Sequence, residues 1–195
     1  MLRTFIALEI SQDTRNKLLN IIGTLQEMET SRSIRWVDPE KIHLTIKFLG
    51  DIQPGRIVDI VSALDEISVK IEPFQFALQG LGCFPNPRNA RVLWVGLGLK
   101  ESGSLYQLHT YVEKALEKAG YPAENKPYHP HLTLARIKNP LGTEKITAML
   151  DRFQSFKTEE SISRIVFMQS ELKPSGSVYT PLHFSVLDGK NSTIR

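Results

Sequence analysis

The sequence predicts a single α+β domain built from two similar halves, with a cleft between them. First, His43-Leu44-Thr45-Ile46 recurs as His131-Leu132-Thr133-Leu134, 88 residues later. Second, an apolar strand, an amphipathic helix and a proline-containing turn precede each copy in the same order. Third, no linker or low-complexity stretch separates the halves. We interpret residues 1–195 as one bilobal domain with an internal duplication, in which the two motifs meet.

Composition narrows the possible functions. With 195 residues, 41% of them hydrophobic and 23% charged, the chain is long and apolar enough to form a core. A net charge of +3 permits a polyanionic partner without requiring one. The one cysteine, Cys83, excludes an intrachain disulfide, as is usual in the reducing cytoplasm. No apolar run has the length of a membrane span, and residues 1–10 lack a signal-peptide core. We expect a cytoplasmic protein that acts as a monomer.

The first half is expected to alternate strands and helices. Apolar runs predict the strands, and apolar residues at helical spacing predict the helices. Ser11 is a suitable N-cap for the first helix, and Pro54 is suited to the first turn of the second. The expected strands are 4–10, 34–37, 42–49 and 74–81.

The second half repeats this alternation. Ser104 is expected to cap a helix that ends at Gly120, and Thr143 opens a further helix. The expected strands are 91–99, the second motif, 161–172 and 179–187.

The repeated motif suits acid–base chemistry on a phosphate. Residues i and i+2 of a strand point to the same side, so each motif offers one imidazole and one hydroxyl on one face. Two imidazoles of pKa about 6.5 can hold one proton between them near neutral pH, one as acid and one as base. Hydroxyl groups can donate to the nonbridging phosphate oxygens. His43 and His131 are therefore the candidate catalytic residues, and Thr45 and Thr133 the candidate phosphate-binding residues.

The sequence gives less support to other roles for its histidines. A lone histidine on an apolar strand is usually structural, and we interpret His109 and His183 in that way. His129 is expected at the surface or behind the site, because Pro130 marks the entry to the strand. Metal binding is not expected, since the motifs lack carboxylate and cysteine ligands and His-x-Thr is not a zinc spacing. No glycine-rich phosphate loop is present, so no nucleotide cofactor is expected.

Three residues beyond the motifs have an ambiguous orientation. Lys47 shares the alternation of the motif residues and is expected at the mouth of the cleft, although a solvated lysine fits as well. Phe48 has the parity of core residues, but near the end of the strand it can instead face a base. Arg136 has the wrong parity, and it reaches the cleft only if the strand ends or bulges near Ala135.

On these residues the chain resembles the two-histidine (2H) phosphoesterases. Within that superfamily it is most similar to the RNA 2′,3′-cyclic phosphodiesterases, historically called 2′-5′ RNA ligases. The doubled motif is specific to the superfamily, and the flanking segments indicate the family. The similarity extends over nearly the whole chain, through residues 5–9, 36–50, 84–88, 130–136 and 170–172.

The resemblance implies two pseudo-symmetric antiparallel sheet lobes with outer helices and a central cleft. It implies metal-independent hydrolysis of a 2′,3′-cyclic phosphate end of RNA to a 2′-phosphate, and by reversal an ATP-independent 2′-5′ ligation. His43 would be the proton donor to the leaving 3′ oxygen, and His131 the proton acceptor from water. The substrate-binding residues that it implies are Thr45, Thr133, Arg136 and Phe48.

Two other functions are compatible with the motifs. A 2H enzyme acting on another small cyclic or 2′-5′ phosphodiester would carry the same residues, and only a panel of substrates separates the two. A non-catalytic RNA-binding module would use the histidines for contacts alone.

Overall fold

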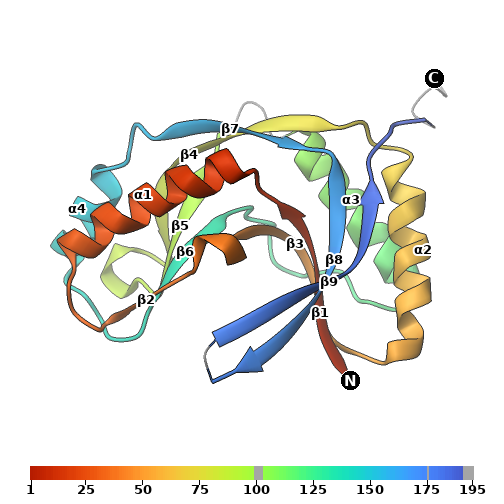
Figure 1. Ribbon diagram of the computed structural model, residues 1–195, viewed down its shortest axis with the longest axis horizontal. Coiled ribbons are helices and arrows are strands. Elements are labelled where there is room, and N and C mark those ends of the chain that lie inside the picture. Colours follow the sequence, from red (N-terminus) through yellow and green to blue (C-terminus); the bar gives the residue numbers. More distant parts are fainter. Residues whose placement is uncertain (99–102, 175, 191–195) are drawn as a thin grey trace.

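The computed structural model describes residues 1–98, 103–174 and 176–190. Within these ranges nine strands form one curled antiparallel sheet in the order β7-β4-β5-β6-β3-β1-β8-β9, with β2 paired to β6 (Figure 1). The strands are β1 (Leu2–Glu9), β2 (Ile34–Trp36), β3 (His43–Ile52), β4 (Phe74–Phe84), β5 (Val92–Leu97), β6 (Leu132–Ile137), β7 (Lys157–Ile162), β8 (Arg164–Lys173) and β9 (Gly176–Val186).

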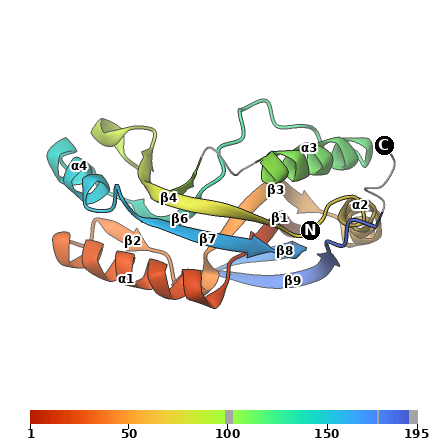
Figure 2. The ribbon, with the colours of Figure 1, turned by 90° about the horizontal axis from the view of Figure 1, so that it is seen from above.

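Helices pack along the outside of this sheet (Figure 2). They are α1 (Gln12–Met28), α2 (Ile57–Ser68), α3 (Gly103–Lys118) and α4 (Thr143–Asp151), with single 3₁₀ turns at Pro39–Lys41, Pro54–Arg56 and Pro87–Asn89. Helix α1 begins as expected after Ser11, whose hydroxyl accepts a hydrogen bond from the amide of Thr14 at 3.2 Å. Its apolar face, including Leu18 and Leu25, is fully buried. In the described ranges no helix is long and apolar enough to cross a membrane.

The centre of the sheet is a narrow seam between β3 and β6. These strands share one paired position, where Leu44 lies opposite Leu132. Outward from the seam, β6 is followed by β5 and β4, and β3 is followed by β1 and β8. The predicted α+β fold is confirmed, and the sheets of the two halves are joined into one at this seam.

Several boundaries differ from the sequence prediction. Strands β3 and β4 each continue three residues past the expected end, to Ile52 and Phe84. The expected strand 161–172 is two strands, because the strand is interrupted at Ser163, between β7, which pairs with β4, and β8, which pairs with β1. Helix α3 already includes Gly103, so Ser104 lies in its first turn and is not its cap. Strand β5 ends at Leu97, and residue 99 of the expected strand lies outside the described residues.

Candidate active site

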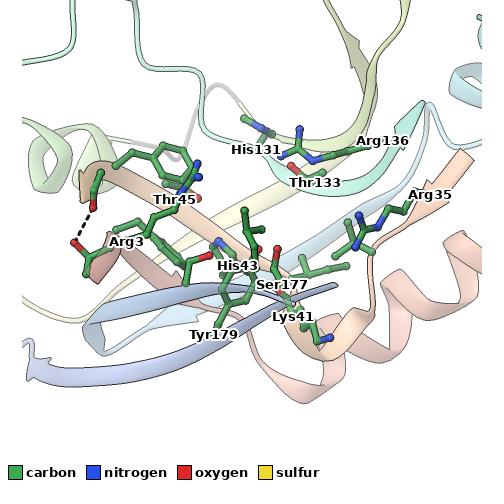
Figure 3. Close-up of a pocket in the computed structure, with 18 of the residues that line it drawn as sticks. Arg3, Arg35, Lys41, His43, Thr45, His131, Thr133, Arg136, Ser177 and Tyr179 are labelled. Atoms are coloured by element: carbon green, nitrogen blue, oxygen red, sulfur yellow. Dashed lines mark hydrogen bonds between the residues drawn. The ribbon is translucent and has the colours of Figure 1, made fainter. Parts of the chain in front are cut away.

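A cleft of about 740 Å³ lies over the seam between β3 and β6 (Figure 3). The predicted site residues all line it, namely His43, Thr45, Phe48, His131, Thr133 and Arg136.

The register at the seam brings the two motifs together. Leu44 lies opposite Leu132, and both side chains are buried beneath the cleft. One residue further along each strand, the antiparallel register sets His43 beside Thr133 and Thr45 beside His131. Each imidazole therefore neighbours the hydroxyl of the other motif, as a shared phosphate site requires.

Both catalytic candidates make the same hydrogen bond to the backbone. Nδ1 of His43 lies 2.8 Å from the carbonyl oxygen of Lys41, and Nδ1 of His131 lies 2.7 Å from that of His129. A carbonyl can only accept, so Nδ1 carries the hydrogen and donates it in both rings. Nε2 has no hydrogen-bond partner within the described ranges, which leaves it to take or give a proton on a ligand.

Aromatic rings hold the imidazole of His43. Phe5 stacks on it with ring centroids 4.8 Å apart, and Tyr179 meets it edge-on at 5.0 Å. Desolvation lowers the pKa of His43 below its ordinary value. The hydrogen bond to the Lys41 carbonyl opposes this shift, and the charge of Arg15 adds to it.

His131 lies in a different aromatic setting. Phe84 meets its ring edge-on at 5.0 Å, and Trp94 lies 6.2 Å away at a tilt. Desolvation again lowers the pKa, opposed by the hydrogen bond to the His129 carbonyl and reinforced by the charge of Arg136. A phosphate anion between the two rings would raise both pKa values, because an opposite charge favours the protonated form.

A β-bulge in β3 decides which side chains reach the cleft. Ile46 is an extra residue against β1, so the alternation reverses beyond it. Ile46 and Lys47 are both buried, whereas Phe48 is 62% exposed and lines the cleft. The expectation that Lys47 lies at the cleft mouth is therefore wrong. Its ammonium group is buried instead, 2.8 Å from a carboxylate oxygen of Glu113 and 2.8 Å from the carbonyl of Pro122.

The same irregularity occurs at the equivalent place in β6. Leu134 is an extra residue against β5, Leu134 and Ala135 are buried, and Arg136 is exposed at the cleft. The sequence predicted that Arg136 would reach the cleft only if the strand ended or bulged near Ala135, and this bulge meets that condition. Because β3 and β6 run in opposite directions from the seam, Phe48 and Arg136 lie toward opposite ends of the cleft.

The remaining histidines have structural surroundings. His109 stacks on Tyr128 with ring centroids 3.9 Å apart, and the Tyr128 hydroxyl donates to the backbone carbonyl of Thr45 at 3.1 Å. Burial raises the pKa of the Tyr128 phenol, which keeps this donor protonated. His183 lies 2.9 Å from Asp65. The ring of His129 is exposed, and its backbone carbonyl supports the catalytic candidate two residues on.

Sequence reasoning missed part of the cleft wall. Strand β9, more than forty residues after the second motif, contributes Ser177 and Tyr179, and no local pattern connects them with the histidines. Arg3, Arg35 and Lys41 also line the cleft. Among the described residues, no group of three or more His, Cys, Asp or Glu side chains is arranged to hold a metal ion.

Known proteins match this chain in sequence. The family model of LigT-like phosphoesterases matches residues 8–94 and 97–179. An RNA 2′,3′-cyclic phosphodiesterase of Methanothermobacter thermautotrophicus is 31% identical over 181 residues, which covers 92% of this chain and 96% of the relative. One from Aquifex aeolicus is 32% identical over 178 residues, covering 89% and 94%.

Solved structures match it in fold. TT0787 of Thermus thermophilus has a TM-score of 0.78 and 27% identity, covering 97% of this chain and all of that one (100%). Escherichia coli LigT, solved with 3′-AMP, has a TM-score of 0.76 at 22% identity, covering 95% and 98%, and supports the fold alone. With the family model matched over most of its length and the paired histidine motifs facing one cleft, the chain belongs to the LigT-like phosphoesterase family of the 2H superfamily.

Proposed function

We propose that this protein hydrolyses 2′,3′-cyclic phosphate ends of RNA to 2′-phosphates. The observation that carries the proposal is the pair of imidazoles on adjoining strands, each with Nδ1 bound to a backbone carbonyl and Nε2 left for the substrate. Relatives 31% and 32% identical bear the name RNA 2′,3′-cyclic phosphodiesterase, which supports this substrate class.

In the proposed reaction His131 is the proton acceptor and His43 the proton donor. Water attacks phosphorus and gives a proton to Nε2 of His131, while the bond from phosphorus to the 3′ oxygen breaks. The departing 3′ oxygen takes a proton from Nε2 of His43, which leaves a 3′-hydroxyl and a 2′-phosphate. The backbone carbonyl at each Nδ1 stabilises the imidazolium form of that ring.

The two hydroxyls, Phe48 and Arg136 are assigned to substrate binding. Thr45 and Thr133 donate to the nonbridging oxygens as their charge develops. Arg136 and Phe48 contact the nucleotide from the two ends of the cleft, the guanidinium by charge and the ring by stacking. No metal is required. With a 5′-hydroxyl in place of water as the nucleophile, the same step joins a 2′,3′-cyclic phosphate to that hydroxyl through a 2′-5′ linkage, without ATP.

We also infer that the two halves are copies of one unit, and that the protein acts as a monomer in the cytoplasm. The duplication is supported by the order of elements on either side of the seam and by bulges at Ile46 and Leu134, 88 residues apart. The cytoplasmic location is supported by the single cysteine, which excludes an intrachain disulfide.

The deciding experiment is turnover of a short RNA ending in 2′,3′-cyclic phosphate, with the product isomer identified by NMR. We expect a 2′-phosphate, at an unchanged rate after exhaustive chelation. Loss of activity on chelation, with recovery on adding zinc or manganese, would contradict the metal-independent mechanism.

A panel that includes 2′-5′ dinucleotides separates the other functions. Faster turnover of a 2′-5′ linkage would show that the protein prefers another phosphodiester substrate, which it cleaves with the same two-histidine chemistry. Tight RNA binding with no turnover of any substrate would make it a binding module.

A further inference from the structure

Two arginines occupy opposite positions on neighbouring strands at one end of the cleft. Arg35 of β2 is paired with Arg136 of β6 in antiparallel register, and both are exposed and line the cleft. Directly opposed residues have Cβ atoms about 4.5–5.5 Å apart, and like charges in that relation destabilise a sheet. Within the described residues neither arginine has a carboxylate partner, whereas Arg15, Arg56 and Arg164 each have one. This pair therefore carries a repulsion that a bound anion would remove.

The other end of the cleft has no such excess of positive charge. There Arg3 of β1 lies opposite Asp51 of β3, and both line the cleft. Opposite charges in cross-strand positions favour pairing. The field along the cleft is therefore uneven, and an anionic chain that leaves the histidines is attracted toward Arg35 and Arg136.

A side pocket of about 210 Å³ opens from the cleft at the arginine end. Arg35, Arg136 and Lys41 line it together with Ser177 and Tyr179, and these five residues also line the main cleft. In Figure 3, Arg35 and Arg136 lie on the same side of the two histidines, to their right. The side pocket is thus a cationic extension of the catalytic cleft. Asp38, which lies 3.7 Å from Lys41, is the carboxylate on its wall among the described residues.

A glycine of β9 packs closely against Arg35. Gly176 has a φ of 123°, and a Cβ built there would lie 2.9 Å from a terminal nitrogen of the Arg35 guanidinium. A side chain at this position would be strained and would displace the guanidinium. The absence of a side chain at Gly176 therefore leaves room for the Arg35 guanidinium along the side pocket.

We infer that Arg35 and Arg136 form a subsite for the first phosphodiester upstream of the cyclic end, so that the enzyme favours an RNA strand over a mononucleotide. The inference rests on the proposed function, which places the cyclic phosphate between His43 and His131. The next phosphate of the strand is then one nucleotide away. Planar guanidinium groups suit it because they donate two parallel hydrogen bonds to one phosphate.

The test compares three substrates that end in the same 2′,3′-cyclic phosphate. They are a nucleoside, a dinucleotide with a natural phosphodiester, and the same dinucleotide with an uncharged methylphosphonate linkage. For the wild-type protein we expect kcat/KM to be about tenfold higher with the natural linkage than with the uncharged one, as for a charge-assisted hydrogen bond near the surface.

Arg35→Gln should remove most of this preference, because it lowers kcat/KM for the natural dinucleotide by a much larger factor than kcat/KM for the nucleoside and uncharged substrates. Arg35→Lys should keep part of it, since the charge remains but the bidentate geometry is lost. Arg32→Gln is the matched control, because it removes one exposed positive charge three residues away without lining the cleft. Its preference should equal that of the wild type.

Salt dependence gives a second readout. The slope of log KM against log salt for the natural dinucleotide should fall by about 0.7 in Arg35→Gln, the value for one lost phosphate contact on a single strand. With the uncharged linkage, the slopes of the wild type and this variant should be equal.

The outcomes separate the subsite from the proposed function. Equal turnover of charged and uncharged dinucleotides by the wild type, or equal losses with all three substrates in Arg35→Gln, would overturn the subsite alone. Absence of turnover with every substrate would overturn the proposed function and the subsite with it.

Discussion

The strands that carry the two motifs, β3 and β6, have the same local construction. In each, Nδ1 of the histidine is bound to the carbonyl two residues back, a threonine follows two residues on, and a bulge comes after the threonine. The fifth residue after each histidine, Phe48 or Arg136, is turned toward the cleft.

Their surroundings are not alike. His43 is stacked on Phe5, whereas His131 meets the edge of Phe84 and lies near the positive charge of Arg136. Behind the strands the difference is larger: β3 buries the ammonium group of Lys47, where β6 has the methyl group of Ala135.

The two halves of the candidate site are alike in some residues and unlike in others. The repeated residues provide two equivalent imidazoles and two equivalent hydroxyls, while the non-repeated neighbours make one half unlike the other. In the proposed reaction, the distinction between acid and base must therefore come from those neighbours and from the orientation of the substrate. Five predictions test this comparison; the first four are ordered by the size of their expected effect, and the fifth concerns stability.

Removing either imidazole should have the largest effect. His43→Ala and His131→Ala are each expected to lower kcat by about 10²–10⁴-fold, the usual range for a lost general acid or base. A substrate with an activated leaving group needs little help from an acid, so it should rescue His43→Ala and leave His131→Ala impaired. Rescue of His131→Ala alone would mean that the roles are exchanged. Circular dichroism and the unfolding midpoint serve as controls for folding.

The buried lysine behind β3 should matter for stability. Lys47→Met leaves the carboxylate of Glu113 without its ion-pair partner, and breaking such a buried pair costs about 3–5 kcal/mol of unfolding free energy. The double variant Lys47→Met/Glu113→Leu should recover most of the loss. Lys114→Met, at an exposed lysine of the same helix as Glu113, should change the unfolding free energy by less than about 0.5 kcal/mol. Urea denaturation measures the unfolding free energy of all three variants. An unchanged unfolding free energy in Lys47→Met would contradict the role of the ion pair.

The two hydroxyls should contribute nearly equally, because they belong to the repeated part of the site. Thr45→Val and Thr133→Val keep the shape of the side chain and remove one donor. Each is expected to raise the barrier by about 3 kcal/mol or somewhat less, since the cleft is partly solvated. Steady-state kinetics on the dinucleotide that ends in a 2′,3′-cyclic phosphate measures the effect. Wild-type turnover in both variants would show that the hydroxyls do not touch the phosphate.

The smallest effect expected is a displacement of the pH profile on binding. Both pKa values are lowered in the protein by itself, so kcat/KM should fall as pH rises through those lowered values and the acid loses its proton. A bound phosphate raises them again. The alkaline limb of kcat should therefore lie at higher pH than that of kcat/KM, with both limbs reporting the pair of histidines. Coincident limbs would contradict this.

The same lowered pKa values should make the stability of the protein depend on pH. Unfolded histidines titrate near pH 6.5, above the lowered pKa values of the folded protein, so the unfolded state binds more protons below that pH. These two residues therefore reduce the unfolding free energy as pH falls below about 6.5. Inorganic phosphate should lessen that loss, which thermal unfolding with and without phosphate can measure.

The sequence alone was enough to predict the fold class and the two motifs at the centre of the candidate site. The α+β alternation follows from helical and strand periodicities, and the pairing of His43 with Thr45, or of His131 with Thr133, follows from the two-residue period of a strand. These are local properties of the chain. The repeat then indicated that both pairs belong to one site, because equivalent strands of a duplicated unit can meet at its symmetry axis.

Tertiary structure decided the rest. The bulge after Thr45 depends on pairing with β1, and it moved Lys47 into the interior and Phe48 to the cleft, against their parity in a regular strand. The strand is interrupted at Ser163 because β7 and β8 pair with different partners in the sheet. Tyr179 and Arg35 reach the cleft from strands that contain neither motif, and no local pattern in those strands links them to the two histidines. Pairing partners, bulges and long-range contacts arise between distant segments, so no local pattern of residues contains them.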